Sequence, residues 1–430
     1  MLKRFPPNYR TDQELRDLQL AGLRWTVEHA WNNSPFYRKR LDESGVSPGS
    51  IRSLEDLGRL PFTTADDLRD GYPLPLLAVP TRDVIRIHSS SGTTGKRKIL
   101  CYTRKDIDDW QDMFGRCYEM AGLSRDDRVQ ICVGYGLWTA GAGFQLGAER
   151  FGAMAIPSGP GNLELQCNFL IDLQTTVLCC TASMGLLVAE EVHARGLRGR
   201  LRLKKVILGA ERTSDAMLQT IRDLLGVEEV YDIPGLTELY GPGTGLSCRH
   251  NVGIHYWSDY YILEILDPSL LVPVAPGEIG EMVYTTLRKE AAPLLRYRSR
   301  DLTRLIEGPC PCGSILPRHD KILGRSDDMV VFRGVNVYPG QVDEVLSRIG
   351  RIGSEYQVLL DRKADGKDYM TVKVERAADA AEDDTASVAR IVASEIKRNL
   401  MVSCAVDMIP YGTLPRSERK TKRIFDNRPV

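Results

Sequence analysis

The stretch Ser89-Ser90-Ser91-Gly92-Thr93-Thr94-Gly95-Lys96 is the feature around which the chain is organised. Seven small residues precede its lysine, and short apolar runs at 84–87 and 99–102 flank it. Glycines permit the positive φ values that turn successive N–H groups toward an anion, and hydroxyls add donors. We therefore expect a phosphate-binding turn between two strands, although a polar surface hairpin has the same composition. A Walker A loop is excluded, because it needs glycine at position 90 and Ser or Thr at position 97.

Length and charge narrow the class of protein. A chain of 430 residues is long enough for two or three domains. The 57 basic and 57 acidic residues cancel, so no overall basic field favours nucleic acid or an anionic membrane. The first residues lack the apolar core of a signal peptide, and the ten cysteines are scattered, as reduced thiols of a cytoplasmic protein would be. We expect no membrane-spanning segment.

Strand-like and helix-like segments alternate between residues 103 and 233. This βαβα rhythm predicts a mainly parallel sheet covered by helices. Ligands of such sheets gather beyond the carboxyl ends of the strands. The loops at 135–138, 209–212 and 234–238 are expected there, and the strands are predicted at 129–133, 153–157, 177–180, 205–209 and 230–233.

The pattern changes after residue 250. Short β-type runs predict a β-rich subdomain, and a compact strand–helix pattern beyond Gly324 predicts a small α+β domain. We predict an α/β fold, with an N-terminal domain at 1–325 and a C-terminal domain at 326–430.

Two acidic segments could hold parts of a nucleotide. Thr237 and Glu238 directly follow a predicted strand end, where oxygen ligands could bind Mg²⁺ and a phosphate. Asp301 ends the run 296–301 and could accept both hydroxyls of a ribose. Taken alone, Glu238 is compatible with an ordinary loop carboxylate, and the run 296–301 with a charged edge strand.

Cysteine and histidine residues predict a second metal site. Cys310 and Cys312 lie in a Pro/Gly-rich turn, and Cys248 and His255 lie upstream, with His250 as an alternative. Three thiols and an imidazole suit a tetrahedral zinc ion, although C-x-C is tighter than the usual spacing. We expect a structural zinc that stabilises the β-rich subdomain.

Taken together, the segments resemble the adenylate-forming ligase superfamily, and within it the phenylacetate–CoA ligase family. The resemblance extends from about residue 10 to residue 428. The segments 324–329, 334–339 and 414–418 are similar to sequence motifs of that family. It implies that a carboxylic acid reacts with ATP to give an acyl-adenylate, and that coenzyme A then displaces AMP. The partners would be a small aromatic acid, ATP and CoA. The cofactors would be Mg²⁺ and the structural zinc.

The resemblance also implies roles for individual residues. The loop 89–96 would hold the β- and γ-phosphates, and Glu238 with Thr237 would bind Mg²⁺. Lys420 would be the catalytic lysine of the mobile C-terminal domain, Asp327 the hinge, and Gly334 the residue next to CoA. Nucleotide contacts would come from Gly209, Ala210, Glu211, Asp301, Arg325 and Asn336, and the acid pocket from Tyr135, Gly136, Trp138, Ala210, Pro234 and Gly235.

Two residues depart from the family pattern, and the acceptor stays open. Pro234 replaces a tyrosine, and Arg419 replaces a glycine before Lys420, which leaves Lys422 as a rival. Alternatives to an aryl-CoA ligase are transfer of the aryl group to a carrier-protein thiol or an amine, transfer of AMP to a hydroxyl as in coenzyme F390 synthetase, and a nucleotide-binding regulator without turnover. A homodimer is the default assembly.

Overall fold

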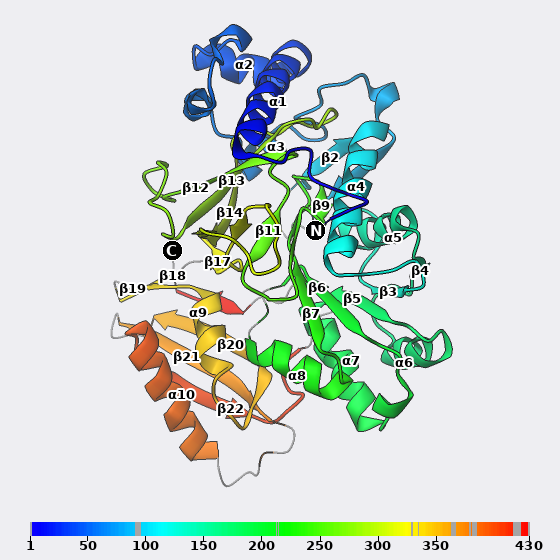
Figure 1. The fold of residues 1–430 in the computed structure, drawn as a ribbon. Helices are drawn as coiled ribbons and strands as arrows, with labels where there is room; N and C mark the ends of the chain where they lie inside the picture. Colours follow the sequence, from blue (N-terminus) through cyan, green and yellow to red (C-terminus); the bar gives the residue numbers. More distant parts are fainter. Residues whose placement is uncertain are drawn as a thin grey trace.

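The computed structural model describes residues 2–90, 96–211, 213, 215–327, 330–333, 335–362, 367–377, 380, 385–415 and 423–428, apart from the side chains of residues 216, 331, 336 and 354. Figure 1 shows a large part formed by the first three quarters of the chain and a smaller part, coloured yellow to red, beside it. Their hydrophobic cores are separate: two clusters lie within residues 9–316, and a third lies within residues 332–424.

Helices open the chain and cover the top of the large part (Figure 1). Thr11 caps the first helix by accepting a hydrogen bond from the Glu14 N–H, and Pro35 starts the second at a position where no N–H is needed. Thr26 donates to the main-chain oxygen of Thr286 at 2.8 Å, which fixes the first helix against the β-rich region. These elements are α1 (Asp12–Asn33), α2 (Pro35–Glu43), η1 (Pro48–Ser50), η2 (Leu54–Arg59), α3 (Ala65–Asp70) and η3 (Thr81–Asp83).

A five-stranded, all-parallel sheet forms the centre, in the order β4-β3-β5-β6-β7. Its strands are short apolar runs, as strands buried on both faces require. The prediction of a mainly parallel sheet is thereby confirmed. The strands are β3 (Arg128–Cys132), β4 (Met154–Ile156), β5 (Val177–Thr181), β6 (Lys205–Gly209) and β7 (Glu229–Ile233), and the helices are α4 (Arg104–Met120), α5 (Thr139–Phe151), α6 (Leu163–Asp172), α7 (Ala182–Ala194), η4 (Arg198–Arg200) and α8 (Asp215–Leu225).

Glycines on helix α5 face aromatic rings on helix α4, and no larger residue would fit there. A Cβ on Gly143 would lie 2.6 Å from the Trp110 ring, and one on Gly147 would lie 2.5 Å from Phe114. These contacts fix α5, whose first residue directly follows the predicted acid-pocket loop at 135–138.

The β-rich region contains two antiparallel four-stranded sheets, β10-β11-β16-β15 and β12-β13-β14-β17. Strand β14, which carries the 296–301 run, lies between β13 and β17 and is not an edge strand. The bounds are β8 (Gly235–Leu236), β9 (Gly241–Pro242), β10 (Gly245–Ser247), β11 (Ile254–Tyr256), β12 (Tyr261–Leu266), β13 (Gly280–Thr286), β14 (Tyr297–Thr303), β15 (Leu305–Ile306), β16 (Arg318–His319) and β17 (Gly324–Arg325).

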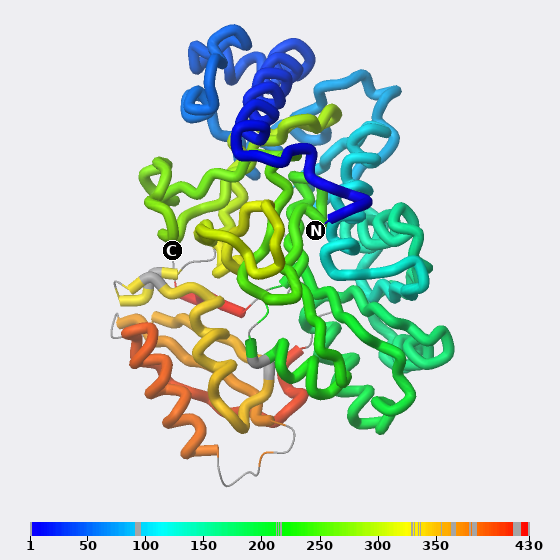
Figure 2. The backbone as a smooth tube through the Cα atoms, viewed as in Figure 1, coloured from blue at the N-terminus to red at the C-terminus, as the bar shows by residue number. Residues whose placement is uncertain are grey.

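The C-terminal part is a four-stranded sheet, β22-β21-β20-β23, preceded by a β18–β19 hairpin and accompanied by two helices (Figure 2). Tyr411 donates a 3.0 Å hydrogen bond to Glu190 on α7, which joins this part to the large one. The bounds are β18 (Val330–Phe332), β19 (Val335–Val337), α9 (Pro339–Leu346), β20 (Ile352–Arg362), β21 (Asp368–Arg376), α10 (Thr385–Leu400), β22 (Ala405–Ile409) and β23 (Ile424–Asp426).

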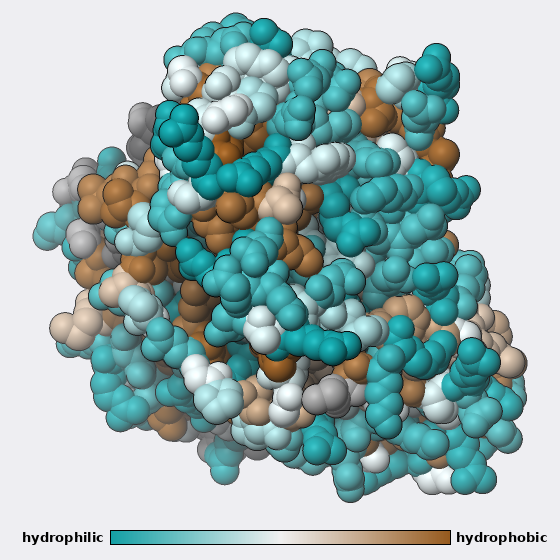
Figure 3. Space-filling model, turned by 45° about the horizontal axis from the view of Figure 1, so that its top comes forward, coloured by the Kyte–Doolittle hydropathy of each residue, from teal (hydrophilic) through white to brown (hydrophobic). Residues whose placement is uncertain are grey.

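Among the described residues, no helix has the length and apolarity needed to cross a membrane. Figure 3 shows a mainly hydrophilic face interrupted by separate hydrophobic patches.

Candidate active site

The phosphate-loop segment joins the two antiparallel strands β1 (Arg86–Ser89) and β2 (Ile99–Tyr102), as predicted. The Ser90 N–H donates to the oxygen of Lys98 at 3.3 Å and closes the base of the loop. The Ser89 N–H donates to the oxygen of Leu137 at 2.8 Å, so the loop starts beside the predicted acid-pocket loop. Five of its predicted residues lie outside the described residues: Ser91, Gly92, Thr93, Thr94 and Gly95.

The described ends of the loop carry polar groups suited to an anion. The Ser90 hydroxyl is buried and has no hydrogen-bond partner among the described residues. The Lys96 ammonium lies 5.9 Å from the centre of the Tyr72 ring. A buried hydroxyl without a partner is costly, and an oxygen-rich ligand would satisfy it.

Glu238 is a buried carboxylate, 1% exposed, in the turn between β8 and β9. It forms an ion pair with Lys98 and accepts a 3.0 Å hydrogen bond from the Tyr297 hydroxyl. Burial by itself would raise the pKa of Glu238, but Lys98 and these hydrogen bonds outweigh it, so the pKa is lowered. Glu238 is therefore ionised, and an anionic oxygen is available for a cation.

Thr237 and two lysines that the sequence did not single out also contribute to this turn. The Thr237 hydroxyl lies 3.4 Å from that of Thr139, and Lys289 donates to the main-chain oxygen of Glu238 at 2.8 Å. The sequence reading missed Lys98 and Lys289, because no motif marks either residue. Lys98 is 140 residues and Lys289 is 51 residues from Glu238 in the sequence, so only the fold brings them to this turn.

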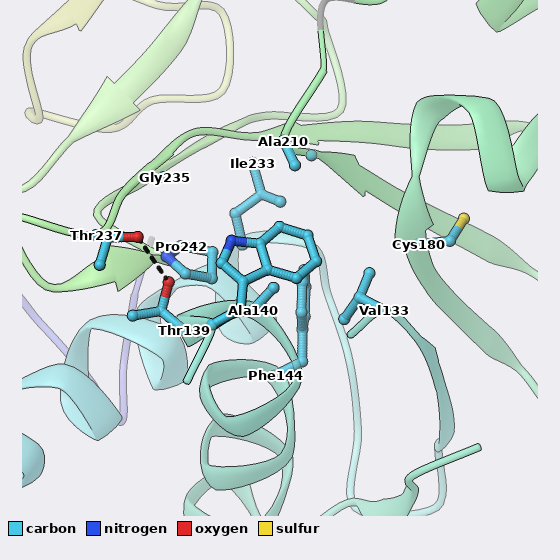
Figure 4. Close-up of a pocket in the computed structure, with 12 residues that line it drawn as sticks. Val133, Thr139, Ala140, Phe144, Cys180, Ala210, Ile233, Gly235, Thr237 and Pro242 are labelled. Carbon is cyan, nitrogen blue, oxygen red and sulfur yellow. Dashed lines mark hydrogen bonds between the residues drawn. The ribbon is translucent and has the colours of Figure 1, made fainter. Parts of the chain in front are cut away.

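A cavity of about 50 Å³ lies beside this turn, at the carboxyl ends of the parallel strands. Its lining contains no charged side chain, and Figure 4 shows the Thr139 and Thr237 hydroxyls facing each other at one end. Val133 lies toward the other end, with Ala140 and Phe144 between. The lining residues are Val133, Trp138, Thr139, Ala140, Phe144, Cys180, Gly209, Ala210, Ile233, Gly235, Thr237 and Pro242.

Three of the six predicted pocket residues line this cavity: Trp138, Ala210 and Gly235. Tyr135, Gly136 and Pro234 are not among its lining residues. The Tyr135 ring packs against Gly141, where a Cβ would lie 2.6 Å from it, and the Pro234 ring packs toward Gly245. Val133, Ala140 and Phe144 were missed as pocket residues, because their apolar side chains are indistinguishable from core residues in the sequence.

The segment 209–211, predicted to flank adenine, borders the cavity from the end of β6. Ala210 has φ +67°, a left-handed conformation that is strained for a residue with a Cβ. Glu211 accepts hydrogen bonds from the Ser183 N–H at 2.9 Å and hydroxyl at 2.6 Å. Burial raises the pKa of Glu211 despite these bonds.

Asp301 and Arg325 are cross-strand partners on β14 and β17, and their side chains lie 3.4 Å apart. Arg325 also binds Asp327 through two 2.8 Å hydrogen bonds. The predicted ribose ligand and the predicted hinge residue thus share one guanidinium. Tyr297 connects the same strand to Glu238.

The predicted zinc ligands converge in the β-rich region. The ligand atoms of Cys248, His255, Cys310 and Cys312 all lie within 4.8 Å of one another. The Sγ atoms of Cys248 and Cys310 are 3.6 Å apart, and Cys312 Sγ is 3.4 Å from His255 Nε2. Tetrahedral zinc places two sulfurs about 3.8 Å apart and a sulfur and a nitrogen about 3.5 Å apart.

His255 presents the correct nitrogen to this cluster. Its Nδ1 lies 3.0 Å from the main-chain oxygen of Leu316, which favours the tautomer with a free lone pair on Nε2. Burial lowers the pKa of His255 to about 4, so the ring is neutral at physiological pH. All ten cysteines are free of disulfides.

Three predicted residues of the C-terminal part cannot be located in the site. Lys420 and Gly334 lie outside the described residues, as do the neighbours Arg419 and Lys422, and Asn336 is described only through its main chain on β19.

Comparison with known proteins defines the class. The model of the "AMP-binding enzyme" family matches residues 40–286, and that of the "AMP-binding enzyme C-terminal domain" matches residues 334–428. The chain is thus an AMP-binding enzyme, and its predicted phosphate loop, Glu238 and the apolar cavity all lie within the residues that the first model matches.

The chain is 40% identical to phenylacetate-coenzyme A ligase of Escherichia coli, over 97% of this chain and 96% of the relative. It is 38% identical to that of Thermus thermophilus, over 97% of both chains. The chain therefore belongs to the phenylacetate–CoA ligase family. The predicted family, the α/β fold class and the class of AMP-forming CoA ligase are confirmed.

A solved relative also indicates how the two parts are arranged. The structure of 2-hydroxyisobutyryl-CoA ligase in the postadenylation state, in complex with 2-HIB-AMP, has a TM-score of 0.91 at 25% identity, covering 99% of this chain and 91% of that one. The same ligase in the thioesterification state, with 2-HIB-AMP and CoA, has a TM-score of 0.71 at 26% identity, covering 97% and 91%. The relative orientation here is thus similar to the postadenylation state.

Proposed function

We propose that this protein activates an aromatic carboxylic acid, aryl or arylacetic, with ATP and transfers the acyl group to coenzyme A. The observation that carries this proposal is the apolar cavity that ends at Thr237, next to the buried carboxylate of Glu238. An acid whose apolar end enters this cavity of about 50 Å³ would have its carboxylate at the hydroxyl end, where the phosphates would lie.

The reaction has two displacements. A carboxylate oxygen attacks the α-phosphorus of ATP, the bond to the β-phosphate breaks, and pyrophosphate leaves. The CoA thiolate then attacks the acyl carbon, and AMP leaves. The side chains of this chain contribute mainly positioning and charge neutralisation, which dominate catalysis of phosphoryl transfer.

Each described group has a proposed role. Ser89, Ser90 and Lys96 hold the phosphates that leave as pyrophosphate, residues 209–211 flank adenine, and Asp301 holds the ribose with Arg325 beside it. Glu238 and Thr237 offer the oxygen ligands that Mg²⁺ prefers, and the ion would neutralise phosphate charge. Gly334, which lies outside the described residues, would lie next to CoA, and Asn336, described only through its main chain, would contact the nucleotide.

The C-terminal part supplies the remaining proposed residues. Asp327 is the hinge between parts at 1–325 and 326–430. Its pairing with Arg325, beside Asp301, supports this role, because a rotation there would alter contacts at the ribose site. Lys420 stabilises the charge that develops at the α-phosphate.

Pyrophosphate exchange with a panel of aromatic acids tests the adenylation step. We expect exchange with benzoic or phenylacetic acids and none with acetate. Failure of every acid to support exchange would contradict the ligase proposal and favour a nucleotide-binding regulator. Addition of CoA and a search by mass for a thioester then distinguishes CoA from a carrier-protein thiol, an amine or a hydroxyl as the acceptor.

A matched pair of variants tests the catalytic lysine. Lys420→Ala should lower adenylation by about 10²-fold or more, because charge stabilisation in the transition state is lost, while ATP still binds. Lys422→Ala, two residues away, is the control and should retain adenylation. The reverse result would transfer the role to Lys422.

We also propose a structural zinc at Cys248, His255, Cys310 and Cys312. The distances of 3.6 Å and 3.4 Å within the cluster support it, as does the neutral imidazole. Four protein ligands leave no open position, which is typical of structural sites. A bound zinc would link β10 and β11 to the turn before β16. Protein purified without chelator should contain about one zinc per chain, and metal-free protein would contradict the site.

We also propose that the enzyme is cytoplasmic and forms a homodimer. Ten free thiols support a reducing cytoplasm, and a homodimer is testable by light scattering at several protein concentrations.

A further inference from the structure

Lys289 lies beneath the turn that carries Thr237 and Glu238, and its side chain is fully buried. Its ammonium donates a 2.8 Å hydrogen bond to the main-chain oxygen of Glu238. The ammonium also lies over two tyrosine rings, 4.9 Å from the centre of Tyr102 and 5.1 Å from that of Tyr240. The position of the charge is therefore fixed from several sides.

Tyr102 also holds the same turn through its hydroxyl. Its hydroxyl lies 3.0 Å from the main-chain oxygen of Thr237 and 3.1 Å from that of Tyr240, each within hydrogen-bonding distance. Lys289 thus donates to one carbonyl oxygen of residues 237–240, and the single hydroxyl proton of Tyr102 lies between two others. The side chains of Thr237 and Glu238 are left to face the cavity and Lys98.

Packing alone does not account for an ammonium at this position. Burying a charge is costly, and an apolar side chain of similar length would fill the space without that cost. The hydrogen bond goes to a carbonyl of the turn, while the nearby Asp106 carboxylate accepts from the N–H groups of Thr103, Glu290 and Ala291.

We propose that Lys289 is a positioning residue for the metal-binding turn: its ammonium fixes the backbone of residues 237–240 so that Glu238 and Thr237 can bind a magnesium–nucleoside triphosphate. This inference rests on the proposed adenylation function. If Lys289 acts in this way, its loss lowers the affinity for the nucleotide with Mg²⁺ more than without it. Loss of a residue that only fills space would affect both affinities equally.

The test compares the affinity for α,β-methylene-ATP with Mg²⁺ and with EDTA, measured by calorimetry. Lys289→Met should reduce the enhancement by Mg²⁺ about tenfold or more, since a hydrogen bond from a charged donor is lost, while metal-free binding changes little. Lys105→Met is the matched control. Lys105 donates to the Arg288 carbonyl at 2.8 Å and to Asp109, and these contacts do not include residues 237–240.

Tyr102→Phe keeps the ring and the ammonium but removes the hydroxyl, so it tests the turn if Lys289→Met does not fold. It should reduce the Mg²⁺ enhancement about threefold or more. An unchanged enhancement in folded Lys289→Met overturns the inference, as does an unchanged enhancement in Tyr102→Phe when Lys289→Met is unfolded. A wild-type protein that does not bind the nucleotide contradicts the proposed function itself.

Discussion

The two candidate metal sites are built in opposite ways. In the cysteine–histidine cluster, four ligand atoms already lie within 4.8 Å of one another, and two of the pairs, at 3.6 and 3.4 Å, are close to the separations around a tetrahedral zinc ion. In the turn at Glu238, one carboxylate is held by the Lys98 ammonium, and the turn borders a cavity. The first site is closed by protein ligands, whereas the second is open to a ligand.

This difference shows how the chemistry of the ligands separates the two proposed roles. Soft thiolates and a neutral imidazole bind zinc strongly and permanently, which suits a cross-link between strands. A single hard carboxylate binds Mg²⁺ weakly without other ligands, so the ion would arrive with the phosphates of ATP. Lys98 keeps the carboxylate ionised until then.

Loss of the proposed zinc cross-link should have the largest effect on stability. Cys312→Ser should abolish zinc binding and destabilise the large part by on the order of 5 kcal/mol, because metal binding contributes directly to folding. Tryptophan fluorescence during chemical denaturation is the measurement, since all five tryptophans precede residue 258. Cys404→Ser, in the C-terminal part, is the control. Equal stabilities for the two variants would contradict a structural zinc.

Glu238→Gln should have the largest effect on chemistry. It removes the anionic ligand while keeping the size of the side chain, so adenylation should fall by about 10²- to 10³-fold, or about 3–4 kcal/mol. Zinc content should not change. Glu229→Gln is a matched control, because Glu229 pairs with Lys205 at the start of β7 rather than beyond its end. Loss of zinc in Glu238→Gln would show that the two sites are coupled.

Lys289, beneath the turn at Glu238, should make the unfolding free energy depend on pH. Burial lowers the pKa of Lys289 from 10.5 to about 8, although Asp106, Glu238 and Cys101 oppose the shift. Between these values the unfolded state binds the extra proton, so stability must rise with pH. Relative to Lys289→Met, the wild type should gain up to about 3 kcal/mol from pH 8 to pH 10.5. A constant difference in unfolding free energy across this range would show that the ammonium titrates normally.

The sequence allowed the parallel sheet, the two strands that flank residues 89–96 and the four candidate zinc ligands to be predicted. These features depend on local patterns: apolar runs, small residues, and cysteines near a histidine. Lys98, Lys289 and Val133 could not be predicted as site residues, because their importance comes from contacts between distant segments. Pro234 illustrates the same limit, since neighbours in sequence do not determine that its ring packs toward Gly245.

The smallest expected effect concerns the depth of the cavity. Val133 lies away from the Thr139–Thr237 end (Figure 4), so a longer acid would extend toward it. Val133→Ala should shift kcat/KM toward 3-phenylpropionate over phenylacetate by about tenfold, which is typical of one or two methylene groups in an apolar pocket. Val133→Phe should shift it toward benzoate. Val129→Ala is the control, because Val129 lies four residues earlier on β3, is equally buried and does not line the cavity. A similar shift in Val129→Ala would indicate general loosening of the sheet, and then the length of the acid would be set elsewhere in the pocket.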